Sequence, residues 1–458
     1  MPRAVAIVGA GPAGFYAAEA LLETLADVRI DIIERLATPF GLIRAGVAPD
    51  HQSTKLVSRR FEQTALQDVV HFYGNVGVGE AVTLEELRRF YDAVVLAVGA
   101  GVDRPLGIPG VHLPGVYGSA LFVGWYNGHP DFRELQPRLD AGPAVVIGNG
   151  NVALDVARVL VKSPEEMATS DLPDYAAAAI RAAGITDVSI VGRRSAADAK
   201  FTLAELREIG HLAECEPVLD AGDLSVPVVA ADDRDRRLHE KNLAILREFA
   251  AAPRGAKPKR LHFRFGLAPV AIEGDGAVEA VVFERTRSEG GGAGSVGTGR
   301  FERIPCGLVV TAIGYRASPL AGIPFDRARG LYPNDAGRVA PGVYAVGWAK
   351  RGPVGVIGSN RPDGALCASQ IAADTAASGG RAARPGRAAL ERVLTERGVR
   401  SITFDDWQKI DAAEIAGARR PAPRRKLTTL GEMLSVLADG GRRSLIVDDA
   451  RVAHRGCG

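Results

Sequence analysis

The amino-acid sequence predicts an α/β protein that contains two nucleotide-binding β-α-β units. An apolar strand at Ala4–Val8 leads into the glycine turn Gly9–Gly14, and a second apolar strand at Ala144–Ile147 leads into the turn Gly148–Ala153. Each turn is followed by a helix-forming segment, and strands that alternate with helices form parallel sheets covered by helices. The second turn begins 139 residues after the first. We therefore expect two Rossmann-like dinucleotide-binding domains.

Composition agrees with this fold class and excludes several others. The chain has 458 residues, of which 47% are hydrophobic and 24% charged, and its net charge is +2. This balance is that of an ordinary globular protein of two or three domains, and the charge gives no reason to expect a nucleic-acid partner. No apolar run reaches the ~18 residues of a membrane span, so we expect no membrane partner.

The four cysteines carry no recognisable chemistry. They are Cys215, Cys306, Cys367 and Cys457, and no two are close in sequence. This spacing fits neither a zinc site, nor an iron–sulfur cluster, nor a Cys-x-x-Cys redox pair, so no metal site is expected. A disulfide framework is not expected in a chain of this size, and the predicted location is the reducing cytoplasm.

The first unit has the features of a site for an unphosphorylated dinucleotide. Gly9 makes the turn, Gly11 lets the backbone approach a pyrophosphate, and Gly14 lets the helix Phe15–Leu25 pack closely on the strand. The next strand, Val28–Ile33, ends at Glu34, twenty residues after Gly14. A carboxylate there accepts from ribose hydroxyls and repels a 2′-phosphate. The site therefore suits FAD or NAD rather than NADP; a surface glutamate after a glycine turn is the plain alternative.

The second unit has the opposite charge. Its Gly-x-Gly-x-x-Ala turn precedes the helix Val152–Val161, and the following strand, Asp187–Val191, ends in Gly192-Arg193-Arg194 with no acid. Two guanidiniums at this position favour a 2′-phosphate. The second site is therefore interpreted as an NADP(H) site, the alternative being a solvated arginine pair. FAD in one site and NADPH in the other imply hydride transfer between nicotinamide and flavin.

The remaining segments are assigned more coarsely. Pro105–Pro114 is a crossover, Leu261–Phe265 and Ala277–Glu284 are expected to be antiparallel strands, and Ser288–Arg300 is expected to be a flexible hairpin tip. Asp374–Pro385 is a predicted linker. Further strands are predicted at Ala93–Val98, Leu308–Ile313 and Gly342–Val346, and further helices at Ala388–Arg397, Phe404–Ile415 and Leu430–Leu437.

Five segments together resemble one known family. They are Thr38-Pro39-Phe40-Gly41-Leu42-Ile43-Arg44-Ala45-Gly46-Val47-Ala48-Pro49-Asp50-His51, Gly148-Asn149-Gly150-Asn151-Val152-Ala153, Val191-Gly192-Arg193-Arg194, Phe201-Thr202-Leu203-Ala204-Glu205-Leu206-Arg207-Glu208 and Val346-Gly347-Trp348-Ala349-Lys350-Arg351-Gly352-Pro353-Val354-Gly355-Val356-Ile357-Gly358. The family is the adrenodoxin reductase type of ferredoxin–NADP+ reductase, which includes actinobacterial NADPH-ferredoxin reductases. The resemblance spans Val5 to roughly Leu437.

The resemblance implies a cofactor arrangement. It implies a discontinuous FAD-binding domain of residues 1–104 and 325–458 around an inserted NADP-binding domain of residues 105–324. FAD would be held noncovalently by Ala13, Glu34, Leu42, Val78, Trp348 and the segment Gly355, Val356 and Ile357. NADP(H) would be held by Asn149, Gly150, Asn151 and Val152, by Arg193 and Arg194 at the 2′-phosphate, by Glu205, and by Gly355 near the nicotinamide. Trp348 has a plain alternative as a core aromatic, and Lys350 and Arg351 as solvated side chains.

The resemblance also implies a polar pair, His51 and Glu208, near the junction of flavin and nicotinamide. A histidine titrates in the range useful for proton handling. The plain alternatives are a histidine that caps the turn Ser53–Lys55 and a carboxylate on a helix surface. The chain departs from the family pattern at Gln52, where proline is usual and a looser turn is expected. It also departs at Ser195-Ala196 and at Asp198, where an acid would weaken preference for NADP.

The implied electron acceptor is a ferredoxin, an acidic iron–sulfur protein, for which a basic docking face is expected. Candidate cations are Arg234, Arg236, Arg237, Lys241, Arg247, Arg254, Lys257, Lys259 and Arg260 in one group, and Arg419, Arg420, Arg424, Arg425 and Lys426 in another. Ordinary solvated charge is the alternative for both.

The expected function is transfer of electrons from NADPH through FAD to ferredoxin. An NADPH diaphorase or quinone-type reductase, and a non-catalytic NADP-sensing flavoprotein, remain alternatives. A flavin disulfide reductase is disfavoured because it needs a dithiol, and the histidine motif of flavin monooxygenases is absent. The weaker resemblance to the reductase subunit of glutamate synthase would require cysteine-rich segments that the start of this chain lacks.

Overall fold

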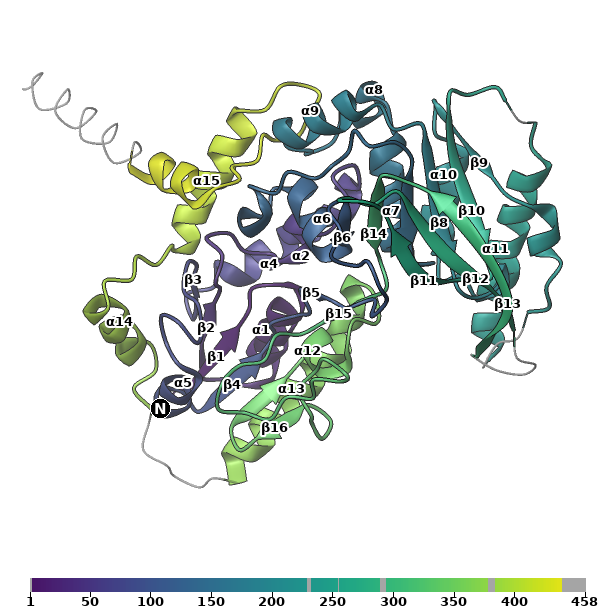
Figure 1. Ribbon diagram of the computed structural model, residues 1–458. Helices are drawn as coiled ribbons and strands as arrows, with labels where there is room; N and C mark the ends of the chain where they lie inside the picture. Colours follow the sequence, from purple (N-terminus) through teal and green to yellow (C-terminus); the bar gives the residue numbers. More distant parts are fainter. Residues whose placement is uncertain (1, 229–231, 254, 289–293, 378–383, 439–458) are drawn as a thin grey trace, which may run out of the picture.

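The computed structural model describes residues 2–228, 232–253, 255–288, 294–377 and 384–438 (Figure 1). It is a mixed α/β structure in which strands from both ends of this range share one sheet. That sheet has six strands in the order β16 (Arg338–Ala340), β17 (Val343–Ala345), β4 (Ala93–Leu96), β1 (Arg3–Val8), β2 (Val28–Ile33) and β3 (Val70–Tyr73). All neighbours pair in parallel except the edge strand β16.

Helices cover both faces of this first sheet, so its central strands are buried on both sides. Alternate residues of β1 point to opposite faces: Val5 and Ile7 belong to one core, and Ala6 and Val8 to the other. The first core is completed by α1 (Pro12–Thr24), α4 (Ser58–Ala65), α13 (Arg361–Ala377) and α15 (Phe404–Ala416), and the second by α5 (Leu84–Phe90) and α14 (Arg387–Glu396).

The second sheet is all-parallel and lies within the middle of the chain. Its order is β6 (Val116–Gly118), β14 (Leu308–Thr311), β7 (Ala144–Ile147), β8 (Asp187–Gly192), β10 (Lys259–Phe265) and β9 (Cys215–Val218). The prediction that Leu261–Phe265 pairs antiparallel is therefore wrong. Its alternating polar residues suggested a half-exposed antiparallel strand, but β10 lies beside the edge strand β9 of a parallel sheet.

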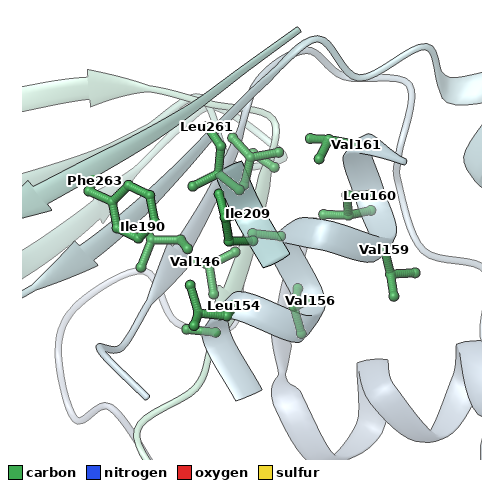
Figure 2. Packing of buried hydrophobic residues seen from close by; sticks show 14 of the residues in the cluster. Val146, Leu154, Val156, Val159, Leu160, Val161, Ile190, Ile209, Leu261 and Phe263 are labelled. Carbon is green, nitrogen blue, oxygen red and sulfur yellow. The ribbon is translucent and has the colours of Figure 1, made fainter. Parts of the chain in front are cut away.

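The two faces of the second sheet are covered differently. Helices α6 (Ser119–Asn127), α7 (Asn151–Val161), α9 (Asp174–Ala183), α10 (Leu203–Gly210) and α11 (Asp233–Ala251) contribute to the core on one face. Figure 2 shows this core, where Val146, Ile190 and Phe263 of the sheet contact Leu154 and Val156 of α7 and Ile209 of α10.

A three-stranded antiparallel sheet, β11 (Leu267–Glu273), β12 (Ala280–Ser288) and β13 (Ser295–Pro305), covers the opposite face. The predicted hairpin tip Ser288–Arg300 is therefore too long. Residues 295–300 belong to β13, and 289–293 lie outside the described residues.

Other helix and strand predictions differ less. The predicted linker Asp374–Pro385 begins inside α13, which ends at Ala377, while 378–383 lie outside the described residues. A short antiparallel pair, β5 (Val102–Asp103) with β15 (Tyr315–Arg316), lies where the chain passes between the two sheets. Short helices complete the fold: α2 (Leu42–Ala45), α3 (Gln52–Lys55), α8 (Pro164–Met167), α12 (Trp348–Arg351) and the helical stretch 430–438.

Within the described residues, no helix is long and apolar enough to cross a bilayer.

Candidate cofactor sites and the cluster between them

The first glycine turn joins β1 to α1 and leaves an open space at Gly11. A Cβ at Gly14 would lie 2.1 Å from the carbonyl oxygen of Gly9, so glycine is required there for close packing. Gly9 itself has φ of +107°, the left-handed region. By contrast, a Cβ at Gly11 would meet nothing within 4 Å. Pro12 has no N–H, and the N–H groups of Gly14 and Phe15 donate to the carbonyl of Gly11 at 3.0 and 3.1 Å. Within the described residues the N–H groups of Gly11 and Ala13 have no acceptor, so they are the donors that an anion at this turn could use.

Glu34 lies at the end of β2 beside this turn. Its Oε2 accepts from the backbone N–H of Ala10 at 2.9 Å, and its Oε1 from that of Leu36 at 3.0 Å. Burial disfavours the charged carboxylate and raises the pKa of Glu34, although both backbone hydrogen bonds oppose this. The two bonds hold the side chain against the turn, and each oxygen keeps a lone pair for a hydroxyl.

A second turn, Phe40-Gly41-Leu42, packs on the first. Phe40 donates its N–H to the carbonyl of Ala10 at 2.8 Å, and a Cβ at Gly41 would lie 3.0 Å from the Cα of Gly11. Phe40 has φ of +78°, a strained conformation for a residue with a side chain. Leu42 is 40% exposed at the start of α2. The turn therefore holds an apolar side chain in the open, close to Gly11.

The segment from Trp348 to Ile357 is fixed by one acid that the sequence analysis did not identify, Asp363. This carboxylate accepts from the N–H of Gly347 at 3.1 Å and from Lys350 Nζ at 2.9 Å, and it also binds Arg351. Arg351 donates further to Ser359 and Asn360. Lys350 and Arg351 are thus internal ion-pair residues and not solvated cations.

This anchoring presents apolar groups outward. Val354 and Val356 are 67% and 66% exposed on either side of Gly355, whose φ is +91°. Trp348 is half-buried and stacks on Tyr315, with ring centroids 6.1 Å apart, so it is not a core aromatic. Tyr315 was not singled out from the sequence because its strand, β15, is only two residues long. Val78, by contrast, packs against the core on the α5 side of the first sheet.

The second glycine turn repeats the pattern between β7 and α7. A Cβ at Gly148 would lie 2.2 Å from the carbonyl oxygen of Ala312, whereas a Cβ at Gly150 meets nothing within 4 Å. The side chain of Asn149 lies over Gly192, where a Cβ would come within 1.8 Å of its Nδ2. Both polar atoms of the Asn149 side chain are buried without a hydrogen-bond partner among the described residues. A buried amide without partners is costly, so its donor and acceptor fit a ligand lying on the turn.

Arg193 and Arg194 follow β8 beside this turn. Among the described residues, neither guanidinium forms an ion pair. Their backbone is held by the three-stranded sheet, since Thr286 Oγ1 donates to the Arg193 carbonyl at 2.6 Å. Asp198 accepts from Ser195 Oγ at 2.6 Å. The acid is therefore bound within its own turn.

Val152 and Asn151 begin α7, and Asn151 ties that helix to the start of α10. Its Oδ1 accepts from the N–H of Thr202 at 2.9 Å. α10 carries Glu205 and Glu208, which face His51 in the loop before α3. His51 Nε2 lies 2.9 Å from Glu208 Oε2 and 3.3 Å from Glu205 Oε2.

The structure thus brings together the predicted pair from residues 157 positions apart. His51 occupies the N-cap position of α3, but its side chain makes no capping hydrogen bond. The N-cap position agrees with the plain alternative for His51, while the Glu208 carboxylate is paired with His51 and Lys162 and is not free on the helix surface.

Four further charged residues complete this cluster, and the sequence analysis named none of them as functional. They are Asp50 on the same loop and Asp155, Arg158 and Lys162 on or directly after α7. The loop itself is closed by Gln52, which donates its side-chain amide to the carbonyl of Pro49 at 2.7 Å. This hydrogen bond ties Gln52 to the loop at the position where a looser turn was expected.

The acids of the cluster fall into two groups, one with lowered and one with raised pKa values. Burial disfavours ionised Glu208, but His51, Arg158 and Lys162 outweigh it and lower the pKa of Glu208 to about 2. Burial likewise opposes ionised Asp50, whose pKa nevertheless falls because of Arg158 and Lys162.

Asp155 and Glu205 behave oppositely. Burial raises the pKa of both, and for Glu205 the neighbouring Asp155 adds to the rise. For His51, burial disfavours the imidazolium, but the hydrogen bond with Glu208 outweighs it and the pKa rises. Acids whose environments push their pKa values apart are typical of sites that handle protons.

The two candidate docking groups differ in the structure. In the second group, Lys426 is buried against Asp171, and Arg424 binds Asp411 and Glu414, so these two cations are internal. In the first group, Lys259 binds Glu214 and the Val161 carbonyl. Four exposed cations lie on α11, Arg236, Arg237, Lys241 and Arg247, among the exposed acids Asp233, Asp235, Glu240 and Glu248 of the same helix. Arg236 pairs with Asp233 at 3.5 Å. The side chain of Arg234 and all of Arg254 lie outside the described residues.

Comparison with known proteins adds to this geometry. The family model described as "Pyridine nucleotide-disulphide oxidoreductase" matches residues 3–197. The chain is 42% identical to NADPH-ferredoxin reductase FprA of Mycobacterium tuberculosis, covering 95% of this chain and 99% of that protein. It is 43% identical to the human mitochondrial NADPH:adrenodoxin oxidoreductase, covering 94% and 91%. Among solved structures, Mycobacterium tuberculosis FprA in complex with NADPH matches with a TM-score of 0.90 and 41% identity, over 95% of this chain and 99% of that one.

Proposed function

The chain belongs to the family of NADPH-ferredoxin reductases and NADPH:adrenodoxin oxidoreductases, and from this premise we propose that it passes electrons from NADPH through FAD to a ferredoxin. The proposal rests on one observation in the structure: the two glycine turns have side chains of opposite charge beside them. Glu34 flanks the first turn, and Arg193 and Arg194 flank the second. One chain therefore holds a site for an unphosphorylated dinucleotide and a site for a 2′-phosphorylated one.

The residues of the first site fit FAD. The open space over Gly11 and the N–H groups of Gly11 and Ala13, which have no acceptor among the described residues, suit the pyrophosphate, and Glu34 suits the ribose hydroxyls. Exposed Leu42, Val354 and Val356 would be covered by an apolar ring system. We assign Ala13, Val78, Trp348, Gly355 and Ile357 to the same noncovalent site. A bound flavin takes up a hydride and releases its electrons singly.

The residues of the second site fit NADP(H). The Asn149 side-chain amide, which has no hydrogen-bond partner among the described residues, and the open space over Gly150 lie at the start of α7. Asn151 and Val152 begin this helix. Arg193 and Arg194 are free to bind a 2′-phosphate as charge-assisted pairs. Glu205, which lies 3.3 Å from His51 Nε2, is assigned to the same site as an acceptor of hydrogen bonds.

We assign the proton handling to His51 and Glu208. NADPH gives up a hydride, whereas ferredoxin takes single electrons, so each turnover leaves a proton to be released. Glu208 stays anionic and holds His51 Nε2, so that the imidazole can carry this proton. Asp155 and Glu205, with raised pKa values, are the neighbouring groups able to receive it.

The partner and its docking face follow from charge. We assign the docking of an acidic ferredoxin to the exposed cations of α11 in the inserted domain, which lie among exposed acids of the same helix. The two sheets support a discontinuous FAD domain of residues 1–104 and 325–458 around an NADP domain of residues 105–324. Cys215, Cys306 and Cys367 are buried free thiols, which favours the cytoplasm as the location.

The test is NADPH-dependent reduction of cytochrome c, with and without a ferredoxin from the same cell. The proposal expects a large gain on adding ferredoxin, and this gain should shrink as salt screens the docking face. Turnover that ignores ferredoxin would contradict the proposed acceptor and favour a diaphorase or quinone-type reductase.

A further inference from the structure

Lys162 follows the last residue of α7 and joins the two halves of the charged cluster. Its Nζ lies 2.7 Å from Asp50 Oδ2, on the loop that carries His51, and 2.9 Å from Glu208 Oε1, on α10 of the inserted domain. The side chain is 10% exposed. The ammonium therefore bridges two carboxylates that come from opposite sides of the interface.

The Glu208 carboxylate is held at both oxygens. Oε1 accepts from Lys162, and Oε2 lies 2.9 Å from His51 Nε2. A carboxylate bound at one oxygen by a fixed cation cannot rotate without losing that bond. Because 32% of the Glu208 side chain is exposed, water is available to it as an alternative partner. The bond to Lys162 is what keeps Oε2 directed at the imidazole.

Arg158 fixes the other end of the bridge. Its guanidinium is fully buried and binds Asp50 through two atoms, Nε to Oδ2 at 2.9 Å and Nη2 to Oδ1 at 3.0 Å. This fork orients Asp50, so that its Oδ2 is presented to Lys162. Asp50 is bonded to Arg158 even without Lys162. Arg158 Nε also lies 3.5 Å from Glu208 Oε1, but the hydrogen bond of 2.9 Å from Lys162 is the shorter contact of that oxygen.

The helix that carries these cations begins at the second glycine turn. Asn151 is its first residue, and Lys162 directly follows its end. An α-helix of this length is a stiff rod. The element whose start is proposed to bind NADP(H) therefore also determines where Glu208 stands relative to His51.

We propose that Lys162 is a positioning residue, which holds Glu208 Oε2 against His51 Nε2 and so sets the geometry of the polar pair to which proton handling is assigned. This inference rests on the proposed function. Lys162 acts through Glu208 and is not assigned contact with either cofactor.

Two roles for Lys162 predict opposite responses of His51. The charged groups that face the imidazole are Asp50, Asp155, Arg158, Glu205 and Glu208, with Lys162 behind Glu208. If Lys162 acted only as a nearby positive charge, removing it would raise the pKa of His51. If it positions Glu208, removing it lets that carboxylate turn toward water, and the pKa of His51 falls toward its ordinary value of about 6.5.

The experiment compares Lys162→Met and Lys162→Arg in the FAD-loaded protein with the wild type. Lys259→Met is the matched control, because Lys259 is also a part-buried lysine of the inserted domain but binds Glu214 and the Val161 carbonyl. The first readout is the pKa of His51, from NMR titration of protein labelled with ¹⁵N-histidine and assigned with His51→Gln. The second is the rate at which the NADPH-reduced flavin is reoxidised by ferricyanide, the step in which the proton is released.

The proposal expects Lys162→Met to lower the pKa of His51 and to slow reoxidation of the flavin by about tenfold, in line with the cost of a misplaced proton-transfer group. Lys162→Arg should restore most of both, and Lys259→Met should change neither. If Lys162→Met does not yield folded, FAD-loaded protein, Lys162→Gln replaces it with the same expectations. An unchanged or raised pKa of His51 would overturn the proposal. Failure of the proposed function is a separate result: the wild-type flavin itself would not be reduced by NADPH.

Discussion

Replacing Gly11 with alanine should impair the proposed FAD site without disturbing the fold. A Cβ at Gly11 meets nothing within 4 Å, and the residue has φ of −84°, which alanine adopts freely. The protein should therefore fold as before. The new methyl group enters the space where the pyrophosphate would lie against the backbone N–H groups of α1, so binding of FAD should weaken.

The size of this effect follows from the bonds that are lost. A hydrogen bond to a charged group contributes about 1.5–3 kcal/mol. Losing one weakens FAD binding by roughly 10- to 150-fold. The matched control is Gly101→Ala, at another glycine with nothing within 4 Å of an added Cβ and no positive φ. Gly14→Ala, by contrast, places a Cβ 2.1 Å from the Gly9 carbonyl oxygen and should destabilise the fold itself.

The assay is a titration of the apoprotein with FAD, followed by flavin fluorescence, with thermal unfolding of the apoprotein measured alongside. The account predicts weaker FAD binding and an unchanged unfolding temperature of the apoprotein for Gly11→Ala. Wild-type affinity in that variant would refute the assignment of the open space to a phosphate. A large drop in the unfolding temperature would refute the reading of Gly11 as structurally unconstrained.

Three further predictions concern charge. Arg193→Ala with Arg194→Ala should raise the KM for NADPH by about tenfold or more, through loss of charge-assisted bonds, and leave the KM for NADH unchanged; equal losses for both would contradict the 2′-phosphate assignment. The pKa of Glu208 is lowered to about 2, so its contribution to stability is present above its ordinary value and lost as the pH falls through 4.5 toward 2. Glu208→Gln should therefore flatten the fall in unfolding temperature over that range, and an unchanged slope would count against it. Arg236→Glu with Arg237→Glu should lower kcat/KM for ferredoxin at low salt but not NADPH-dependent reduction of ferricyanide, and a loss with both acceptors would point to misfolding.

Much of the fold could be predicted from local pattern. The two strand–turn–helix units are encoded within short segments, because glycine positions and apolar runs determine them directly. β2 and β7 have the predicted bounds, Val28–Ile33 and Ala144–Ile147. β10 was assigned to the wrong kind of sheet, because alternating residues such as His262 and Arg264 occur both on antiparallel strands and near the edge of a parallel sheet.

The candidate site was predictable only in part. Glu34 and the arginine pair stand at fixed spacings from their glycine turns, so the sequence carries a signal for them. Lys162 and Asp363 stand at no such fixed spacing from a glycine turn. The role of Lys162 depends on a partner far along the chain, and that of Asp363 on how the chain turns back after Trp348–Ile357. Lys162 meets Asp50 from 112 positions away, and only the folded arrangement of two domains brings them together.

The measurement that tests the central claim most directly is an anaerobic titration of the purified protein with NADPH while the flavin absorbance is followed. The account predicts that NADPH bleaches the bound flavin stoichiometrically, that NADH does so far less well, and that a ferredoxin then restores the oxidised spectrum. A flavin that stays oxidised in NADPH, or that responds equally to both nucleotides, would contradict it.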